Sequence, residues 1–249
     1  MQALGIDIGG TGIKGAVVDL DTGEFVGERL RIKTPHPATP DDVSYVVGKI
    51  SRNFSWNGPV GITFPGVVKK GVIYTAPNLD PSWVGHDAAG VFADATGCQV
   101  RVVNDADAAG VAEGRFGHPE ADEGVVVLLT LGTGIGSALL LDGELIPNSE
   151  LGHLKMGKKQ LDAEKLASEL VRERDKLSWK AWAERVSAYL QAVETILWPD
   201  LFVLGGGVSG SGDKFIPRLK CRTKVVPAEL LNRAGIVGAA LAVAPRGAD

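Results

Sequence analysis

The chain has 249 residues, of which 45% are hydrophobic and 22% charged, and this composition indicates a globular protein with a substantial core. Its net charge of −4 argues against nucleic acid or an anionic membrane as a partner. Two cysteines exclude a disulfide framework, and neither a secretory leader nor a membrane-spanning run is apparent, so we expect a cytoplasmic protein with free thiols.

The first predicted elements are three short apolar strands, and a glycine-rich turn joins the first two. Within this turn, Gly10-Thr11-Gly12-Ile13-Lys14-Gly15 fits the pattern G-x-G-x-x-G. A dinucleotide site would require a helix next, and a nucleotide P-loop would require lysine where Ala16 stands. The β-branched residues that follow predict a strand instead. The turn is therefore the tip of a hairpin, which is either an anion-binding nest assisted by Lys14 or a plain turn.

Helices and strands alternate over the next part of the chain, which is typical of an α/β fold. We expect helices over 41–54, 86–96 and 105–115 and strands over 60–64, 67–74 and 100–103. Asn104 and Asp105 stand where the last of these strands meets a helix. Because ligands bind at the carboxyl ends of strands in open α/β sheets, Asp105 is a candidate general base. The alternative is that Asn104 or Asp105 only caps the helix.

A repeat suggests that the chain consists of two similar halves. The tetrapeptide GTGI occurs at 10–13 and again at 132–135, and each copy lies between two apolar strands. The halves would each present a glycine hairpin, and the two hairpins would hold a chain of phosphates between two domains. Chance similarity of two glycine turns is the alternative.

Glu150 and His153 form an E-x-x-H pattern shortly after the second hairpin. This spacing can bind metal on a helix, but Gly152 weakens any helix here, and further inward carboxylates would be needed. Hydrogen bonding to vicinal sugar hydroxyls is the interpretation that we favour.

The rest of the chain predicts helices over 162–176 and 178–198, a strand over 201–204 and a last helix over about 235–244. The apolar stripe of the second helix indicates core packing or a subunit contact rather than a cofactor site. Gly205, Gly206 and Gly207 follow the strand.

Five segments in this order resemble the ROK family of sugar kinases, which belongs to the actin-like ATPase superfamily. They are GIDIGGTGIKGAVVD (5–19), VVNDADAAG (102–110), LTLGTGIGSALLLDGEL (129–145), ELGH (150–153) and VLGGGVS (203–209). GTGIKG, DAEKLAS (162–168) and the pair WPDLFVLGGGVS with RAGIVGAAL are most similar to its polyphosphate-dependent glucokinases.

The resemblance implies a two-lobed actin-like ATPase fold, which is ribonuclease H-like, with a cleft between duplicated α/β domains. We expect a small domain over 1–105, completed by the C-terminal segment near 235–249, and a larger domain over 106–234. The implied reaction moves the terminal phosphate of inorganic polyphosphate, or of ATP, to the 6-hydroxyl of glucose. Mg²⁺ accompanies the donor, and the family suggests a homodimer.

The resemblance also assigns roles to residues. Asp105 becomes the catalytic base. The implied sugar contacts are Asn78, Asn104, Glu150, His153 and Glu164. The implied phosphate-binding residues are Asp7, Gly9, Gly10, Thr11, Gly12, Lys14, Gly132, Thr133, Gly134, Gly206 and Gly207.

The sequence departs from most of the family at one point. Most members carry a cysteine-rich zinc motif after this histidine, and it ends in a sugar-binding glutamate. Residues 154–176 contain no cysteine, so we expect no structural zinc, and Glu164 is our choice for the glutamate. Polyphosphate glucokinases share this departure.

Two basic stretches are candidates for guiding a polyanion, although either could be a solvated face. They are 214–224, with five basic residues and no acidic one, and the cluster Lys155, Lys158 and Lys159. The alternatives to a polyphosphate enzyme are an ATP-dependent glucokinase, a related ROK hexose kinase such as an N-acetylmannosamine kinase, and a non-catalytic sugar-binding regulator. A repressor of this family would need an N-terminal helix-turn-helix, whereas this sequence starts on a strand.

Overall fold

The computed structural model describes residues 1–244, which form two compact units. The first unit comprises Met1–Ala112 and the residues from Arg233 onward, and the second comprises Glu113–Asn232. The division thus falls inside helix α3 (Asp105–Phe116), whereas the sequence placed it between 105 and 106. The first turns of α3 pack within the first unit, where the Ala108 carbonyl lies against Gly238. Residues 245–249 of the predicted C-terminal segment lie outside the described residues.

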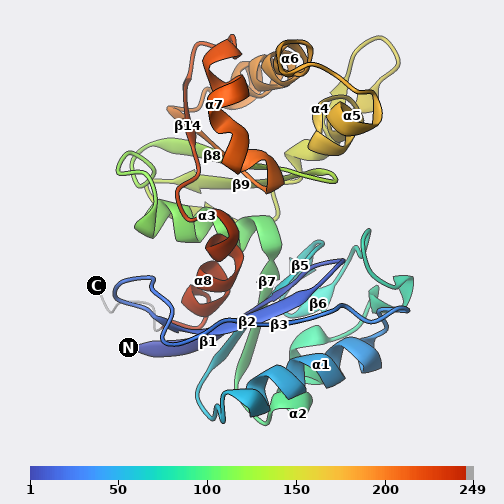
Figure 1. The fold of residues 1–249 in the computed structure, drawn as a ribbon, viewed down its shortest axis with the longest axis vertical. Coiled ribbons are helices and arrows are strands. Elements are labelled where there is room, and N and C mark those ends of the chain that lie inside the picture. The colour runs from blue at the N-terminus through green and yellow to red at the C-terminus, as the bar shows by residue number, and fades with distance from the viewer. Residues whose placement is uncertain (245–249) are drawn as a thin grey trace. The chain divides into compact units, whose positions relative to one another are not determined.

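The elements of each unit follow in chain order (Figure 1). The first unit contains β1 (Gln2–Ile8), β2 (Ile13–Asp19), β3 (Leu30–Ile32), α1 (Pro40–Asn53), β4 (Val60–Phe64), β5 (Val68–Lys69), β6 (Val72–Ile73), α2 (Ala88–Thr96), β7 (Val100–Asn104), most of α3 and α8 (Ala234–Leu241). The second unit contains β8 (Val125–Leu131), β9 (Ile135–Leu141), β10 (Glu144–Ile146), β11 (Lys155–Met156), β12 (Leu161–Asp162), α4 (Glu164–Ala167), α5 (Glu169–Arg174), α6 (Trp179–Leu197), β13 (Leu201–Gly205), α7 (Gly212–Phe215) and β14 (Lys224–Pro227).

The two units contain sheets of the same topology. The strand order is β3-β2-β1-β4-β7 in the first unit and β10-β9-β8-β13-β14 in the second. In each sheet the first three strands are antiparallel neighbours, and the next two join in parallel. The GTGI repeat therefore marks the same hairpin in two structurally equivalent halves, as the sequence predicts.

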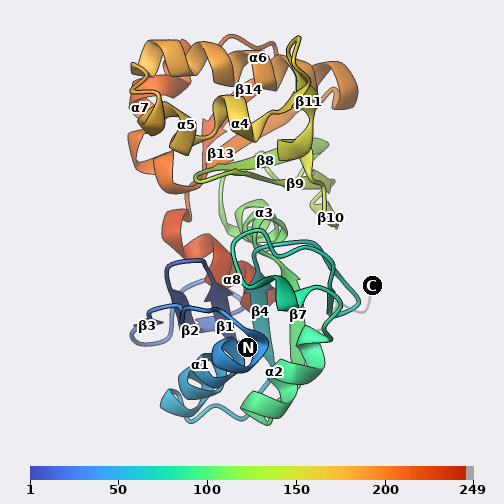
Figure 2. The same ribbon diagram turned by 90° about the vertical axis from the view of Figure 1, so that its right-hand side faces the viewer.

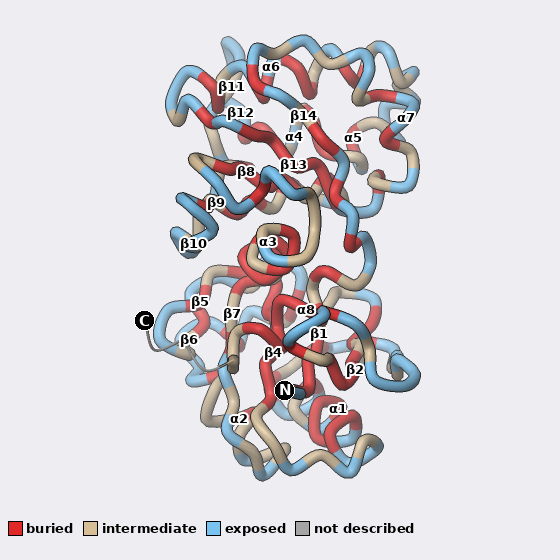
Figure 3. The backbone as a smooth tube through the Cα atoms, turned by 90° about the vertical axis from the view of Figure 1, so that its left-hand side faces the viewer, coloured by how far each residue is buried: buried red, intermediate tan, exposed pale blue. Residues whose placement is uncertain are grey.

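Helices cover both faces of the sheet in the first unit, with α1 and α2 on one side and α8 on the other (Figure 1). The approach of α8 is close because two strand glycines face it. A Cβ on Gly61 would lie 1.6 Å from the Ala239 carbonyl oxygen, and one on Gly5 would lie 2.1 Å from that of Ile236. The central strands β1 and β4 are buried along most of their length (Figure 3).

In the second unit, helices α4 to α7 gather over one face of the sheet, and α6 supplies much of that core (Figure 2). Trp182, Val186, Tyr189 and Val193 of α6 are fully buried, so the apolar stripe is mainly core. Ile196, an apolar residue of the same helix, is exposed. No helix in the described part of the chain combines the length and apolar character that crossing a membrane requires.

Two predicted elements are each divided in the structure. The single strand expected over 67–74 is a hairpin of β5 and β6, because Lys70 and Gly71 both adopt positive φ and turn the chain. The helix expected over 162–176 is broken into α4 and α5 at Ser168. Ser168 has extended backbone angles, and its hydroxyl accepts a hydrogen bond from Val171 N, so it starts a new helix.

The hydroxyl of Tyr189 has no hydrogen-bond partner among the described residues although it is buried, and burial raises the pKa of this tyrosine. An unsatisfied buried hydroxyl destabilises the folded state. We therefore expect Tyr189→Phe to increase the free energy of unfolding by about 1 kcal/mol, measured by urea denaturation. Tyr45→Phe, on an exposed side chain, is the control and should change nothing. Destabilisation by Tyr189→Phe would show that the hydroxyl has a partner.

Candidate active site

The first glycine hairpin connects β1 to β2 through Gly9–Gly12, and Gly9 N donates to the Gly12 carbonyl at 3.1 Å. The Thr34 hydroxyl donates to the Gly9 carbonyl at 2.5 Å and ties the hairpin to the loop after β3. Asn78 lies against this tip, because a Cβ on Gly10 would be 3.5 Å from its carbonyl oxygen. None of these glycines has positive φ. The tip therefore does not alternate right- and left-handed residues, and anion binding by its backbone N–H groups stays a prediction.

Asp7 occupies the carboxyl end of β1, beside the hairpin. One of its carboxylate oxygens accepts a hydrogen bond from the Thr63 hydroxyl at 2.9 Å, and the other pairs with Lys14 Nζ at 3.1 Å. The Thr63 hydroxyl also accepts from Ile8 N at 3.1 Å. Asp7 and Lys14 are partly buried, so the carboxylate and the ammonium group are held in fixed positions at this edge.

The carboxyl ends of three parallel strands meet at the same edge of the first sheet. Asp7 is paired with Thr63, and Phe64 is paired with Asn104, the last residue of β7. Asp105 is the first residue of α3, immediately beyond Asn104. The chain therefore brings Asp7 and the predicted base to one sheet edge, which is where α/β sheets bind ligands.

Asn104 has a structural task at this edge. Its side-chain oxygen accepts a hydrogen bond from Asp107 N at 2.9 Å, and its Nδ2 donates to the Gly66 carbonyl at 3.0 Å. Asn104 thus caps α3, which is the alternative that the sequence left open. The partly buried Asp105 carboxylate accepts a hydrogen bond from Ala106 N at 2.9 Å. Asp105 therefore does not make the capping hydrogen bond to Asp107 N that Asn104 makes.

The second hairpin, Gly132–Gly134, lies beside the three-glycine segment of the second unit. Gly132 N donates to the Gly134 carbonyl at 3.0 Å. Gly206 adopts φ +90° and ψ −165°, and a Cβ there would lie 2.6 Å from both the nitrogen and the carbonyl oxygen of Leu131. Glycine is required at 206 by both its backbone angles and this approach. The two loops therefore adjoin at the carboxyl ends of β8 and β13.

Glu150, His153 and Glu164 come together in the second unit, and Glu164 touches the second hairpin. Residues 151–153 form a 3-10 turn that docks on β9, with the Leu151 N donating to the Ser137 hydroxyl at 3.0 Å. His153 Nε2 lies 3.6 Å from Glu150 Oε2. Glu164 reaches the hairpin, since its Oε2 would be 2.5 Å from a Cβ on Gly134. The sequence thus selected three polar side chains that the fold of this unit assembles.

A group of three potential metal ligands includes two of these residues. Ligand atoms of His153, Asp162 and Glu164 lie within 4.8 Å of one another. Both oxygens of Asp162 are already paired, one with Lys155 and the other with Lys165, and hydrogen bonds from these lysines lower the pKa of Asp162. Two ammonium groups oppose a cation at this position. The group is therefore a poor metal site as it stands, and the expectation of no structural zinc stays a prediction.

The basic residues of segment 214–224 are exposed, but some already have partners. Lys224 pairs with Glu120, whose pKa is lowered by that hydrogen bond, and the Arg222 guanidinium lies 4.0 Å from the ring centroid of Trp198. Arg218 and Lys220 are exposed on the same segment. In the second basic stretch, Lys155 is held by Asp162.

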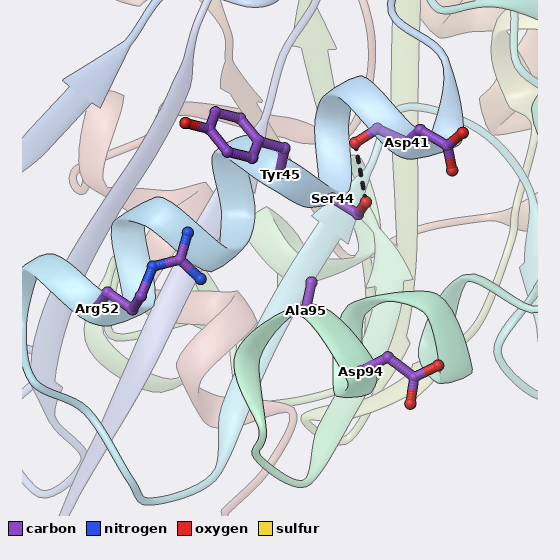
Figure 4. Close-up of a pocket in the computed structure, with 6 residues that line it drawn as sticks. All are labelled: Asp41, Ser44, Tyr45, Arg52, Asp94 and Ala95. Carbon is purple, nitrogen blue, oxygen red and sulfur yellow. Dashed lines mark hydrogen bonds between the residues drawn. The ribbon is translucent and has the colours of Figure 1, made fainter.

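A surface groove lies elsewhere in the first unit, between α1 and α2 (Figure 4). Its volume is about 470 Å³, and its lining residues are Asp41, Ser44, Tyr45, Arg52, Asp94 and Ala95. None of the predicted site residues lines it. We therefore place the chemistry at the sheet edges and not in this groove.

The chain matches known proteins over most of its length. Residues 3–166 match the ROK family. The chain belongs to the ROK family. It is 52% identical over 242 residues to a polyphosphate glucokinase of Mycobacterium tuberculosis, covering 97% of this chain and 91% of the relative. A polyphosphate glucokinase of Mycobacterium leprae is 48% identical over 242 residues, covering 97% of this chain and 74% of that protein.

Solved structures of other ROK family members have the same fold. The crystal structure of an inorganic polyphosphate/ATP-glucomannokinase from Arthrobacter sp. strain KM superposes with a TM-score of 0.91 at 47% identity, covering 96% of this chain and 97% of that one. A Streptomyces griseus ROK glucokinase has a TM-score of 0.80 at 24% identity and covers 96% of this chain and 98% of that one. The predicted family and the two-lobed actin-like ATPase fold are confirmed.

Sequence reasoning missed residues that touch the predicted site. Thr63 holds Asp7, and Glu169 reaches Gly207, where its Oε2 would be 2.8 Å from a Cβ. Thr63 lies near the carboxyl end of the predicted strand 60–64, and this position is a signal for a ligand-binding residue in an α/β sheet. Sequence reasoning did not identify Glu169 as a site residue, because it expected one continuous helix over 162–176 and no helix start at Ser168.

Proposed function

We propose that this ROK family member transfers the terminal phosphate of inorganic polyphosphate to the 6-hydroxyl of glucose, giving glucose 6-phosphate. The observation that carries the proposal is its 52% identity to a polyphosphate glucokinase over 97% of the chain. The paired glycine hairpins and the carboxylate at the end of β7 support it, because phosphoryl transfer depends on positioning and charge neutralisation.

The acceptor half of the reaction uses the polar side chains that the resemblance assigns to the base and to the sugar. Asp105 takes the proton from the attacking glucose hydroxyl. Glu150, His153 and Glu164 bind the sugar hydroxyls, and their proximity to one another in the second unit supports this role. Asn104 positions Asp105 by capping α3, and its remaining hydrogen-bonding capacity is available to the sugar. Asn78, an exposed residue against Gly10, is the more peripheral contact of this set.

The donor half uses the glycine loops. Gly9 to Gly12 and Lys14 of the first unit, and Gly132 to Gly134, Gly206 and Gly207 of the second, bind the terminal phosphates. Thr11 and Thr133 add hydroxyl donors at exposed hairpin tips. Small residues at these positions let a phosphate approach the backbone.

A Mg²⁺ ion bound with the donor would neutralise part of the phosphate charge. Asp7 supplies the oxygen ligands that Mg²⁺ prefers, directly or through water. Thr63 already fixes the orientation of this carboxylate, although Lys14 shares one of its oxygens. The residues at the first hairpin therefore fit a divalent ion bound together with phosphate.

The donor is tested by an assay of glucose 6-phosphate with purified polyphosphate in the absence of nucleotide. Product formation is the expected result, and its absence would overturn the proposal. ATP as donor and mannose as acceptor are measured in parallel, because the Arthrobacter relative is a polyphosphate/ATP-glucomannokinase. An enzyme that uses ATP alone would be an ATP-dependent hexose kinase, which is the second candidate.

Segment 214–224 guides the polyphosphate chain through its exposed cations. Charge reversal at Arg218, Lys220 and Arg222 should raise the Michaelis constant for long polyphosphate about tenfold or more at low salt, and much less for ATP. Steady-state kinetics with both donors at two ionic strengths measure this. Reversal of Arg29, Lys49 and Arg52, three exposed cations of the first unit, is the control for net charge. Equal effects on both donors would contradict the guiding role.

Three further properties belong to this proposal. The protein is a homodimer, as the family resemblance implies, which light scattering tests. It is cytoplasmic, and neither nucleic acid nor membrane is a partner. It holds no structural zinc, which metal analysis of the purified protein tests.

A further inference from the structure

Helix α5 contacts both glycine loops of the second unit. The Leu170 N donates to the Gly132 carbonyl at 3.1 Å. The Glu169 carboxylate lies against Gly207, with its Oε2 2.8 Å from the position of a Cβ on that glycine. The side chains that follow on α5 are therefore close to the loops that we assign to the donor phosphates.

Arg172 stands one turn further along α5 and is only loosely paired. Its Nη2 lies 3.9 Å from Glu169 Oε1 and 3.4 Å from Glu173 Oε1. Its side chain is 19% exposed, and among the described residues its buried Nε has no hydrogen-bond partner. A guanidinium with an unused N–H can bind a phosphate by donating to its oxygens, because it offers several donors in one plane.

A second cation shares the aromatic ring beneath Arg172. The Arg172 guanidinium lies 4.2 Å from the ring centroid of Trp179, and Lys214 Nζ lies 5.6 Å from the same centroid. Both cations therefore lie near one ring, and two positive charges in the same region favour the binding of an anion. Lys214 is also the first basic residue of segment 214–224, which follows the Gly207 loop along the chain.

We propose that Arg172 and Lys214 form a subsite for a phosphate of inorganic polyphosphate that is not transferred, and that Glu169 competes with this phosphate for Arg172. The inference rests on the proposed function. A polyphosphate chain continues beyond the phosphates at the glycine loops, whereas ATP continues as adenosine. The subsite therefore favours polyphosphate over ATP.

The charge of Glu169 makes the subsite sensitive to pH. Burial raises the pKa of the Glu169 carboxyl above its ordinary value, and the charge of Glu173 acts in the same direction, while Arg172 opposes both. As the pH rises through this elevated pKa, the carboxylate forms, attracts Arg172 and repels phosphate. The Michaelis constant for polyphosphate should then rise.

The principal test is Arg172→Met, with kinetics on polyphosphate, ATP and glucose. We expect the Michaelis constant for polyphosphate to rise about tenfold to a hundredfold, the range for a charge-assisted hydrogen bond. The constants for ATP and glucose should stay within about twofold. Arg174→Met is the matched control, because Arg174 lies on the same helix but is 61% exposed and paired with Asp175. Arg172→Lys, which keeps the charge and loses the planar fork, should give an intermediate value.

The second test is Glu169→Gln, alone and combined with Arg172→Met. Glu169→Gln should lower the Michaelis constant for polyphosphate about two- to fivefold and remove its rise with pH relative to the parent enzyme. In the double variant Glu169→Gln should no longer lower the Michaelis constant for polyphosphate, since the two residues act on one phosphate. A merely structural role of Glu169 would change thermal stability but not the pH profile.

The outcomes separate this subsite from the proposed function. If the parent enzyme uses polyphosphate but Arg172→Met behaves as Arg174→Met does, the subsite is wrong and the function stands. A higher Michaelis constant for polyphosphate in Glu169→Gln would also overturn it. If the parent enzyme neither uses polyphosphate nor binds it in calorimetry, the proposed donor fails and the subsite fails with it.

Discussion

Replacing Asp105 by Asn should lower kcat by a factor on the order of 10² to 10⁴, the usual contribution of a positioned general base. Asn has nearly the same shape, and its side-chain oxygen can still accept the hydrogen bond from Ala106 N. Helix α3 should therefore form as before, and the Michaelis constant for glucose should change only slightly. The measurement is steady-state kinetics with polyphosphate as donor, together with thermal unfolding of the variant.

The structural alternative for Asp105 predicts the opposite pattern. A residue that only stabilises the start of α3 would lower the melting temperature when it is replaced and would leave kcat unchanged. Asp94→Asn, on an exposed residue of α2, controls for loss of one negative charge in the same unit. Near-normal turnover of Asp105→Asn with intact glucose binding would remove Asp105 from the role of base.

Asn104 and Asp105 show why a polar pair at the end of a strand can be interpreted either as a helix cap or as a ligand site. An Asn–Asp pair between a strand and a helix predicts a cap and a ligand site equally well. The structure assigns the cap to Asn104, whose oxygen accepts from Asp107 N. Asp105 is thereby placed as the next side chain at the sheet edge. Local sequence shows that the edge is polar, but only the hydrogen bonds show which side chain caps the helix.

Most of the fold could be predicted because the sequence repeats it. The apolar strands around the two GTGI copies determined the hairpins, and the equivalent sheet orders follow from the same pattern. The association of Glu150 with His153 was predictable because they are three residues apart. Contacts such as that of Thr63 with Asp7 join residues far apart in the sequence, and hydrophobic periodicity carries no information about them.

Among the differences between the predicted and the observed elements, the division of one helix into α4 and α5 changes the candidate site most. Periodicity over 162–176 indicates one helix, and that interpretation misses the start of α5 at Ser168. The serine at 168, followed by an acidic residue, is a helix-start signal that was available. Its significance depends on the packing of Leu170 and Glu169 against two loops that come from other parts of the chain.

The largest effect on stability is expected at Gly206. Alanine at this position must adopt φ near +90° and ψ near −165°, and its Cβ would lie 2.6 Å from backbone atoms of Leu131. Backbone strain and overpacking together should lower the free energy of unfolding by about 3–5 kcal/mol. Chemical denaturation measures this loss.

Gly206→Ala should also impair catalysis, because relief of the backbone strain would move the three-glycine segment 205–207, whose Gly206 and Gly207 we assign to the donor phosphates. A shift of about 1 Å can cost on the order of 10² in kcat/KM, and we expect a loss of this size for polyphosphate. Gly210→Ala is the matched control in the segment that follows, since nothing lies within 4 Å of a Cβ there and the backbone does not have positive φ. It should retain stability and activity. If Gly206→Ala were destabilised yet kept the parent kcat/KM, the three-glycine segment would be a packing element of β13 and would not bind the donor.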